Sequence, residues 1–292
     1  MRRARVVSAA LGLAVLGATW HASAFCLTHG CNERKQDCGL TSEGCLNNGP
    51  LLHWPSSCVS FDVQKDGSPL RELGYDEAHE AVLNGFRQWI NADCGDGQHP
   101  DVTMSDYGPV ECHEAEYNQD APNANIVMFR DDSWPYQNAI DTLALTTLIF
   151  NADTGAIYDA DVEVNTFQAP MSLGIVGPGE VDFNSVITHE LGHFLGLSHS
   201  GVPGSTMNRS YAPGDTAMAS IEQDDVNGIC AALPPGRAVA STSCEPRHGF
   251  STECALPLTT CGFHPGGAGI RGSLLLAVLG LSAARRRKKP RP

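Results

Sequence analysis

Basic residues are scarce in the body of this chain. Of its 292 residues, 25–261 contain all 33 acidic side chains but only 9 of the 19 lysines and arginines, a net charge of −24. A protein that neutralises the phosphates of nucleic acid needs the opposite surplus. The composition therefore argues against a nucleic-acid partner. Two interpretations of the acidic surface stay open: it keeps the protein soluble, or it supplies carboxylates to calcium.

The C-terminal end lacks an apolar run long enough to span a membrane. The run at 273–284 has about a dozen residues, whereas a span needs roughly 20. It lies between Cys261, with its glycine-rich spacer, and the basic cluster Arg285–Lys289. This arrangement resembles the MYXO-CTERM sorting tags that direct proteins to the surface of certain Gram-negative bacteria. The resemblance implies a tag over 262–292 with a short apolar helix, and a frayed apolar tail is the alternative.

The N-terminal end is typical of an exported protein. A basic start (Met1–Arg5) precedes an apolar stretch from about Val6 to Thr19, and Ala22–Ala24 offers a small-residue cleavage site. These features predict a secretory signal peptide over residues 1–24. We therefore expect a monomer, extracellular or on the cell surface, that contacts membrane only through its signal peptide and its tag.

Eleven cysteines in an exported chain favour disulfides over metal clusters. Ten remain if Cys261 belongs to the tag, which is an even number. Cys94 and Cys112 bracket a loop after the first predicted helix, and we predict that they pair. Zinc binding by the five N-terminal cysteines is the alternative, although their spacing fits no standard Cys-x-x-Cys site. These five are Cys26, Cys31, Cys38, Cys45 and Cys58.

Residues 189–199 read His-Glu-Leu-Gly-His-Phe-Leu-Gly-Leu-Ser-His and predict a zinc site. On a helix, His189 and His193 project from one face, so their imidazoles can bind one metal ion. Gly196 has no Cβ, so the helix can end there and the chain can turn to bring His199 to the same ion. Three protein ligands leave a coordination position for water, which is typical of catalytic rather than structural zinc.

Glu190 follows the first ligand and is rotated from it by about a quarter turn, so its carboxylate can touch the bound water instead of the metal. We predict that Glu190 acts as general base, and that it then delivers a proton to the departing amine. The predicted reaction is hydrolysis of a peptide bond in a protein or peptide substrate. Two alternatives stay open, an amide hydrolase for cell-wall peptides and a zinc-stabilised binding module without catalysis.

The motif, with Met207 eight residues after His199, resembles that of the metzincins, His-Glu-x-x-His-x-x-Gly-x-x-His plus a Met-turn. Ser200 after the third ligand, the step to Met207, and Tyr211 four residues later resemble the matrixins within that group. The resemblance covers roughly residues 52–235. It implies that Met207 forms a hydrophobic floor below the metal.

The resemblance also implies a fold. We expect an α/β (α+β) metzincin-like domain with a mixed twisted sheet of about five strands, three main helices, and a zinc cleft between an upper and a lower subdomain. In such enzymes the substrate lies along an edge strand as an added antiparallel strand. The substrate-binding residues implied here are Leu143, Ala144, Leu145 and Tyr211.

Two features of animal matrixins are missing from this chain. Leu145 and Asp161 stand where histidines of a second, structural zinc are expected, so we predict a single catalytic zinc. The propeptide Pro-Arg-Cys-Gly motif, whose cysteine binds the active zinc, is absent as well.

A candidate calcium site lies upstream of the zinc motif. Its residues are Asp153, Asp159, Asp161 and Glu163. Carboxylate oxygens are ligands that calcium prefers, although the spacing matches no EF-hand loop. A solvated acidic turn between two strands is the alternative.

The chain is expected to contain five segments. They are the signal peptide 1–24, a Cys-rich extension 25–51, the catalytic domain 52–236, a Cys-containing stalk 237–261, and the tag 262–292. Alternating or continuous apolar residues predict strands near 59–63, 101–104, 125–129, 143–150 and 160–164. Apolar residues at helical spacing predict a first helix over 78–90, a zinc helix from Asp182 or Asn184, and a last helix near 219–232.

Overall fold

The structure, a computed structural model, describes residues 25–31, 39–42, 44–136, 141–254, 274–279 and 281–283. The predicted signal peptide and most of the predicted tag lie outside the described residues. Within these ranges, no helix has the length and apolar character that a membrane span requires.

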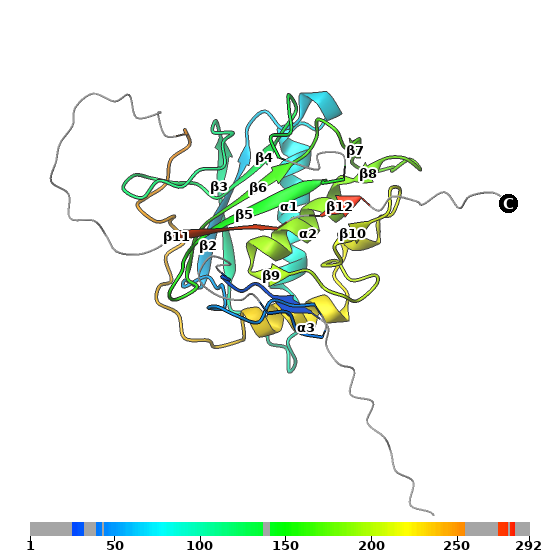
Figure 1. Cartoon of the computed structure of the whole chain (residues 1–292). Coiled ribbons are helices and arrows are strands. Elements are labelled where there is room, and N and C mark those ends of the chain that lie inside the picture. Colours follow the sequence, from blue (N-terminus) through cyan, green and yellow to red (C-terminus); the bar gives the residue numbers. More distant parts are fainter. Residues whose placement is uncertain are drawn as a thin grey trace, which may run out of the picture.

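A mixed sheet occupies the centre of the molecule, in the order β11-β5-β6-β4-β2-β3 (Figure 1). Its strands are β2 (Cys58–Gln64), β3 (Thr103–Val110), β4 (Ile126–Phe129), β5 (Ala144–Asn151), β6 (Ile157–Val164) and β11 (Leu274–Leu279). β5 and β11 run antiparallel to their neighbours, and the other pairs are parallel. All five predicted strands are present, which confirms the predicted sheet; β11 is a sixth strand that the sequence did not predict.

Three α-helices complete the predicted fold. They are α1 (Tyr75–Ile90), α2 (Phe183–Phe194) and α3 (Gln223–Ala232), with single 3-10 turns η1 (Pro69–Arg71) and η2 (Ala217–Ala219). The inward face of α1 packs with alternate residues of β2 in one core; Phe86 and Phe61 have ring centroids 4.8 Å apart. α1 also packs on α2, where a Cβ on Gly85 would lie 2.7 Å from Leu191 Cδ1. The two helices approach this closely because position 85 has no side chain.

Short strand pairs connect distant parts of the chain near α2. β1 (Cys26–Leu27) pairs antiparallel with β9 (Leu197–Ser198), and β7 (Met171–Ser172) pairs parallel with β8 (Val181–Asp182). β10 (Ser210–Tyr211) pairs parallel with β12 (Ser282–Ala283). Residues from both ends of the described chain therefore lie beside the segments around α2.

Residues that follow α3 pack back against the domain. One of them, Phe250, packs against a second apolar cluster, which contains Ile126 and Met128 of β4. Arg237 donates from its guanidinium to the backbone oxygens of Asp101, Trp54 and Ser56. Residues 237–254, which we expected to form a stalk, instead pack against the catalytic domain.

The predicted disulfide Cys94–Cys112 is wrong. Cys94 pairs with Cys230 of α3, and Cys112 pairs with Cys254. Two further disulfides join Cys26 to Cys45 and Cys58 to Cys244. Each of these bonds, apart from Cys26–Cys45, joins residues more than 130 positions apart, so loop bracketing could not identify the partner.

The apolar run near the C-terminus is not helical where the structure describes it. Residues 274–279 form β11 at the edge of the main sheet, and 282–283 form β12. β11 lies along β5 over six residue pairs, from Leu274↔Asn151 to Leu279↔Thr146 (Figure 1). The strand along which we expected a substrate to lie is therefore paired with the chain's own C-terminal segment.

Candidate metal centre

Helix α2 carries two of the three predicted zinc ligands. Its N-cap is Asp182, one of the two predicted caps, whose side chain accepts hydrogen bonds from Ser185 N and Ser185 Oγ at 3.0 and 2.6 Å. The helix is buried along almost its whole length, which suits a segment that passes through the core. Trp89 of α1 donates from Nε1 to Thr188 O at 2.8 Å and so fixes the turn that precedes His189.

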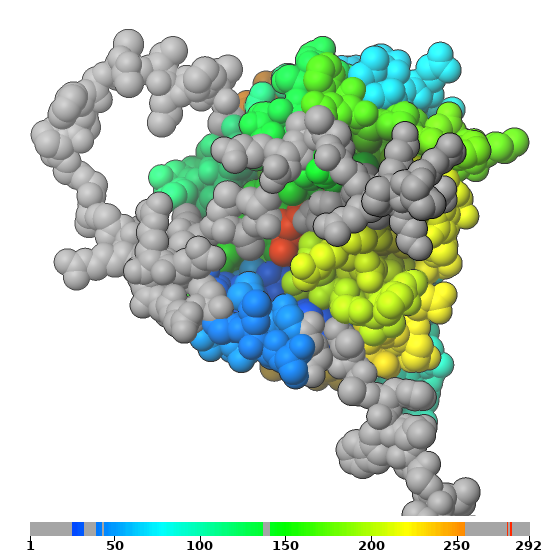
Figure 2. Space-filling view, turned by 45° about the vertical axis from the view of Figure 1, so that its right-hand side comes forward, coloured from blue at the N-terminus to red at the C-terminus, as the bar shows by residue number. Residues whose placement is uncertain are grey.

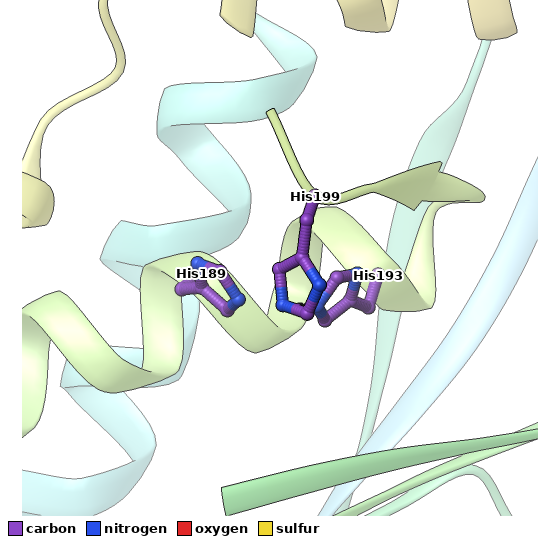
Figure 3. Close-up of side chains that lie close together, drawn as sticks. All are labelled: His189, His193 and His199. Carbon is purple, nitrogen blue, oxygen red and sulfur yellow. Dashed lines mark hydrogen bonds between the residues drawn. The ribbon is translucent and has the colours of Figure 1, made fainter. Parts of the chain in front are cut away.

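The third predicted ligand reaches the same point after α2 ends. Gly196 has a φ of +102°, a conformation that a side chain would strain, and the chain turns there into β9 and on to His199. Figure 3 shows the imidazoles of His189, His193 and His199 converging on one point. Their ligand nitrogens all lie within 4.8 Å of one another, which is close enough to share one metal ion.

Two backbone carbonyls orient the helical histidines. His189 Nδ1 donates to Thr206 O at 2.6 Å, and His193 Nδ1 donates to Leu197 O at 2.9 Å. Because a carbonyl can only accept, each ring carries its proton on Nδ1 and keeps a lone pair on Nε2. His189 Nε2 is buried without a hydrogen-bond partner among the described residues. An orphaned imidazole nitrogen that faces two others fits a zinc ion.

Burial keeps these imidazoles neutral. It lowers the pKa of His189 to about 3 and that of His193 well below its ordinary value, and the neighbouring histidines lower both further. A neutral imidazole is the form that binds metal. Burial and the hydrogen bonds from Nδ1 therefore both favour neutral imidazoles whose Nε2 can bind a metal ion.

Met207 packs against α2 beside Gly192, close to the helical histidines. Its side chain is buried, and its Sδ would lie 2.3 Å from a Cβ on Gly192 of α2. The backbone of the turn is held by Asp225 of α3, whose carboxylate accepts from Thr206 N at 2.8 Å and Met207 N at 3.0 Å. We did not identify Asp225 from the sequence, because the contact joins segments 18 residues apart without a recognisable spacing.

Glu190 is fully buried beside the histidine cluster. Thr146 of β5 donates from Oγ1 to Glu190 Oε2 at 2.7 Å, and Leu281 N donates to Glu190 Oε1 at 3.1 Å. Burial raises the pKa of the carboxyl to about 8, and these two hydrogen bonds oppose the rise. We did not identify Thr146 from the sequence either, although it directly follows Leu143, Ala144 and Leu145, which we had predicted to bind substrate.

The predicted substrate-binding residues differ in their surroundings. Leu143 N donates to Leu281 O at 2.8 Å, so this backbone does bind an extended segment. Ala144 and Thr146 face α2, and by strand alternation Leu145 faces away from it. Tyr211 has a fully buried side chain, whose hydroxyl donates to Asp215 O at 2.5 Å and accepts from Asp182 N at 2.9 Å. Its side chain therefore supports the start of α2, and its backbone pairs with β12.

The four candidate calcium ligands do not meet at one point. Asp153 is exposed in the turn before β6, whereas the other three lie buried along that strand. Asp161 accepts hydrogen bonds from Ile126 N and Glu116 N, and Glu163 is paired with Arg130 and Tyr136. A calcium site stays a prediction here, without a shared ligand point to support it.

One other group of side chains in the described residues has metal-ligand spacing, namely Cys112, Glu116 and Cys254. Its two cysteines form a disulfide, which removes both thiolates. Among the described residues, the histidine cluster is therefore the metal site that the geometry supports.

A family model of the matrixins matches residues 54–232. The chain belongs to the matrixin family. Matrixins hold a catalytic zinc in a cluster of three histidines, and in this matrixin the cluster is His189, His193 and His199. The part matched contains the whole site apart from the C-terminal residues that lie against it.

Individual matrixins are similar over parts of the chain. Identity to human neutrophil collagenase is 50% over 202 residues, which are 67% of this chain and 37% of the collagenase. Identity to human matrilysin is 37% over 99 residues, 34% of each protein. Identity to the metalloendoproteinase 5-MMP of Arabidopsis thaliana is 33% over 100 residues, 34% of this chain and 27% of that protein. This matrixin thus spans about a third of the length of these relatives.

Proposed function

We propose that this matrixin is a zinc-dependent endopeptidase that hydrolyses peptide bonds of protein substrates outside the cell. The observation that carries the proposal is the position of Glu190, buried beside the three histidines and held by Thr146 of β5. A carboxylate in that place can serve both the water and the peptide nitrogen of a chain that lies along β5. When bound, zinc acidifies water and stabilises the negative charge that develops on the cleaved carbonyl.

The described residues supply the remaining parts of such a site. Glu190 is the proposed general base, and the hydroxyl of Thr146 fixes one of its oxygens so that the other faces the groove. The amide of Leu143 is the proposed donor to a substrate carbonyl. The backbone of β10, which pairs with β12, is the proposed opposite side of the groove. A peptide held between β5 and β10 would keep its scissile bond beside Glu190.

Export is the second part of the proposal. Disulfides persist in oxidising compartments, and at least four join the described residues. Residues 1–24 are the proposed signal peptide, and 262–292 the proposed surface-sorting tag. Nothing in the site favours cell-wall peptides or a non-catalytic binding role over proteolysis.

The test compares the exported chain with its Glu190→Gln variant. Glu253→Gln is the matched control, because Glu253 is exposed and remote from the histidines. We expect all three proteins to bind about one zinc, and only the Glu190→Gln variant to lose cleavage of a mixed peptide library, by at least about 100-fold. Zinc binding without cleavage by the parent chain would contradict the proposed activity and favour a binding role.

A further inference from the structure

Residues 274–279 and 281–283, here called the C-terminal segment, lie in the groove that the proposed function assigns to substrate. β11 runs antiparallel to β5, and β12 runs parallel to β10. Figure 2 shows red atoms of this segment in a hollow between the green and the yellow-green parts of the molecule. The segment therefore contacts both walls of the groove.

Leu281 makes the contacts that connect this segment to the catalytic residues. Its N–H donates to Glu190 Oε1 at 3.1 Å, and its carbonyl accepts from Leu143 N at 2.8 Å. Its side chain is completely buried and belongs to the main core. An edge strand that only extended the sheet would not need to bind a catalytic carboxylate.

We propose that residues 274–283 are an internal ligand of the substrate groove, which competes with external substrates. This inference rests on the proposed function for the meaning of the groove.

Covalent connection makes the competition effective. Binding of a ligand on the same chain is an intramolecular event, so its effective concentration does not depend on the protein concentration. Backbone pairing over eight residues, together with one buried leucine, then suffices to keep the groove occupied much of the time. External substrate has to displace the segment, which raises the apparent KM and leaves kcat unchanged.

Hydrogen exchange tests occupancy without relying on activity. The exported chain is prepared with Glu190→Gln, which prevents hydrolysis and keeps an oxygen that can accept from Leu281 N. Leu281→Asp, Leu281→Met and Leu40→Asp are then added singly. Asp cannot be buried at 281 without a partner, Met conserves volume, and Leu40 is 65% exposed, so its change is the matched control.

We expect amide exchange in peptides covering 144–151 to accelerate about tenfold or more in Leu281→Asp and to stay unchanged in the other two variants. A synthetic peptide of residues 274–287, added to Leu281→Asp, is expected to restore slow exchange. Equal exchange in Leu281→Asp and its parent overturns the proposal. Faster exchange that spreads to β2 and β3 and is not restored by the peptide also overturns it, since Leu281 is then an ordinary core residue.

Kinetics with Glu190 intact separate this inference from the proposed function. We expect Leu281→Asp to lower the apparent KM for a cleaved library peptide about tenfold at unchanged kcat, and Leu40→Asp to change neither. Cleavage with equal KM in all variants overturns the inference and leaves the endopeptidase standing. Slow exchange of the β5 amides in a chain that cleaves no peptide would support the inference and contradict the proposed endopeptidase activity.

Discussion

Thr146 holds the proposed general base from β5, the strand that packs against α2. A hydroxyl donates one hydrogen bond to Glu190 Oε2, and both side chains are fully buried, so no water can replace the bond. A buried hydrogen bond of this kind contributes about 0.5–1.5 kcal/mol. Thr146 is therefore a positioning residue: it acts on Glu190 and does not itself meet the substrate.

The first prediction concerns Thr146→Val, which keeps the shape of the side chain and removes the donor. We expect kcat on a library peptide to fall about tenfold or more, because Glu190 is no longer fixed in orientation, while KM changes little. Thr146→Ser keeps the hydroxyl and is expected to restore most of kcat. Bound zinc, measured in all three proteins, is expected to stay equal. A loss of zinc in Thr146→Val, or equal loss of kcat in Thr146→Ser, would contradict a positioning role.

At the scale of elements, α2 depends on close packing around a glycine. A Cβ on Gly192 would lie 2.3 Å from Met207 Sδ and 2.8 Å from Trp89 Cζ2, so α1, α2 and the Met-turn meet at this point. The size of the residue at position 192, which lies between the two helical histidines, is thus restricted by the side chains of Met207 and Trp89. Glycine inside a helix ordinarily costs about 1 kcal/mol relative to alanine, and here close packing outweighs that cost.

The second prediction is that Gly192→Ala destabilises the protein despite the better helix propensity of alanine. Overpacking of a core typically costs about 1–3 kcal/mol, so we expect a lower thermal midpoint and weaker zinc retention. Gly179→Ala is the matched control, because a Cβ there meets nothing within 4 Å. Denaturation curves of the three proteins with intact disulfides provide the measurement. A Gly192→Ala variant as stable as the parent would show that Met207 moves aside at little cost.

The sequence predicts some elements better than others. The reason is how far apart along the sequence the residues lie whose contacts determine each element. The spacing of His189, His193 and His199 lies within one helix and one turn, so the ligand set could be predicted locally. Strand alternation and helical spacing are local as well, and they predicted five strands and three helices. Thr146, by contrast, meets Glu190 44 residues away, and nothing in its own neighbourhood marks that role.

The C-terminal run shows the opposite situation. Residues 274–279 read Leu-Leu-Leu-Ala-Val-Leu, which has neither the strand period nor the helix period. Their conformation is decided by pairing with β5, more than 120 residues earlier. The disulfide Cys94–Cys230, with a separation of 136 residues, is equally beyond local reasoning. A strand that pairs with a distant strand, or a cysteine that pairs with a distant cysteine, can be predicted only once the position of its partner is known.

At the scale of the whole molecule, buried carboxyl groups couple stability to pH. Asp62 on β2 is completely buried, and neither carboxyl oxygen has a hydrogen-bond partner among the described residues. Burial, followed by the negative charge of Asp106, raises its pKa from 3.8 to about 8. The unfolded chain therefore releases this proton at lower pH than the folded chain does. Stability from this group is fully present below about pH 4 and declines as pH rises toward 8.

The third prediction is that Asp62→Asn is more stable than the parent at pH 7, on the order of 2 kcal/mol, with a difference that shrinks as pH falls toward 4. Asparagine resembles the protonated acid, so it has no charge to bury. Urea midpoints between pH 4 and 8 measure the effect, and Asp66→Asn, which changes an exposed carboxylate, is the control. A difference in stability between Asp62→Asn and the parent that does not vary with pH would contradict the raised pKa of Asp62.

The fourth prediction follows from the docked C-terminal segment. Leu281 N lies 3.1 Å from Glu190 Oε1, which is the distance at which a general acid could deliver a proton to a departing amine. We expect the active chain to hydrolyse the bond between residues 280 and 281 slowly. Water adds across that bond, which leaves a carboxylate on Gly280 and an amine on Leu281. Intact-mass spectra over time are expected to show a released peptide that begins at Leu281.

The variants already described provide the controls for this cleavage. Glu190→Gln is expected to release nothing, and Leu281→Asp to release at least about tenfold less, because its segment no longer occupies the groove. Release at a rate independent of protein concentration would indicate that each chain cuts itself, since the segment lies in its own groove. A preparation that cleaves added peptides but keeps residues 274–283 intact would mean that the segment binds without presenting its bond to the catalytic residues, as an inhibitor rather than a substrate.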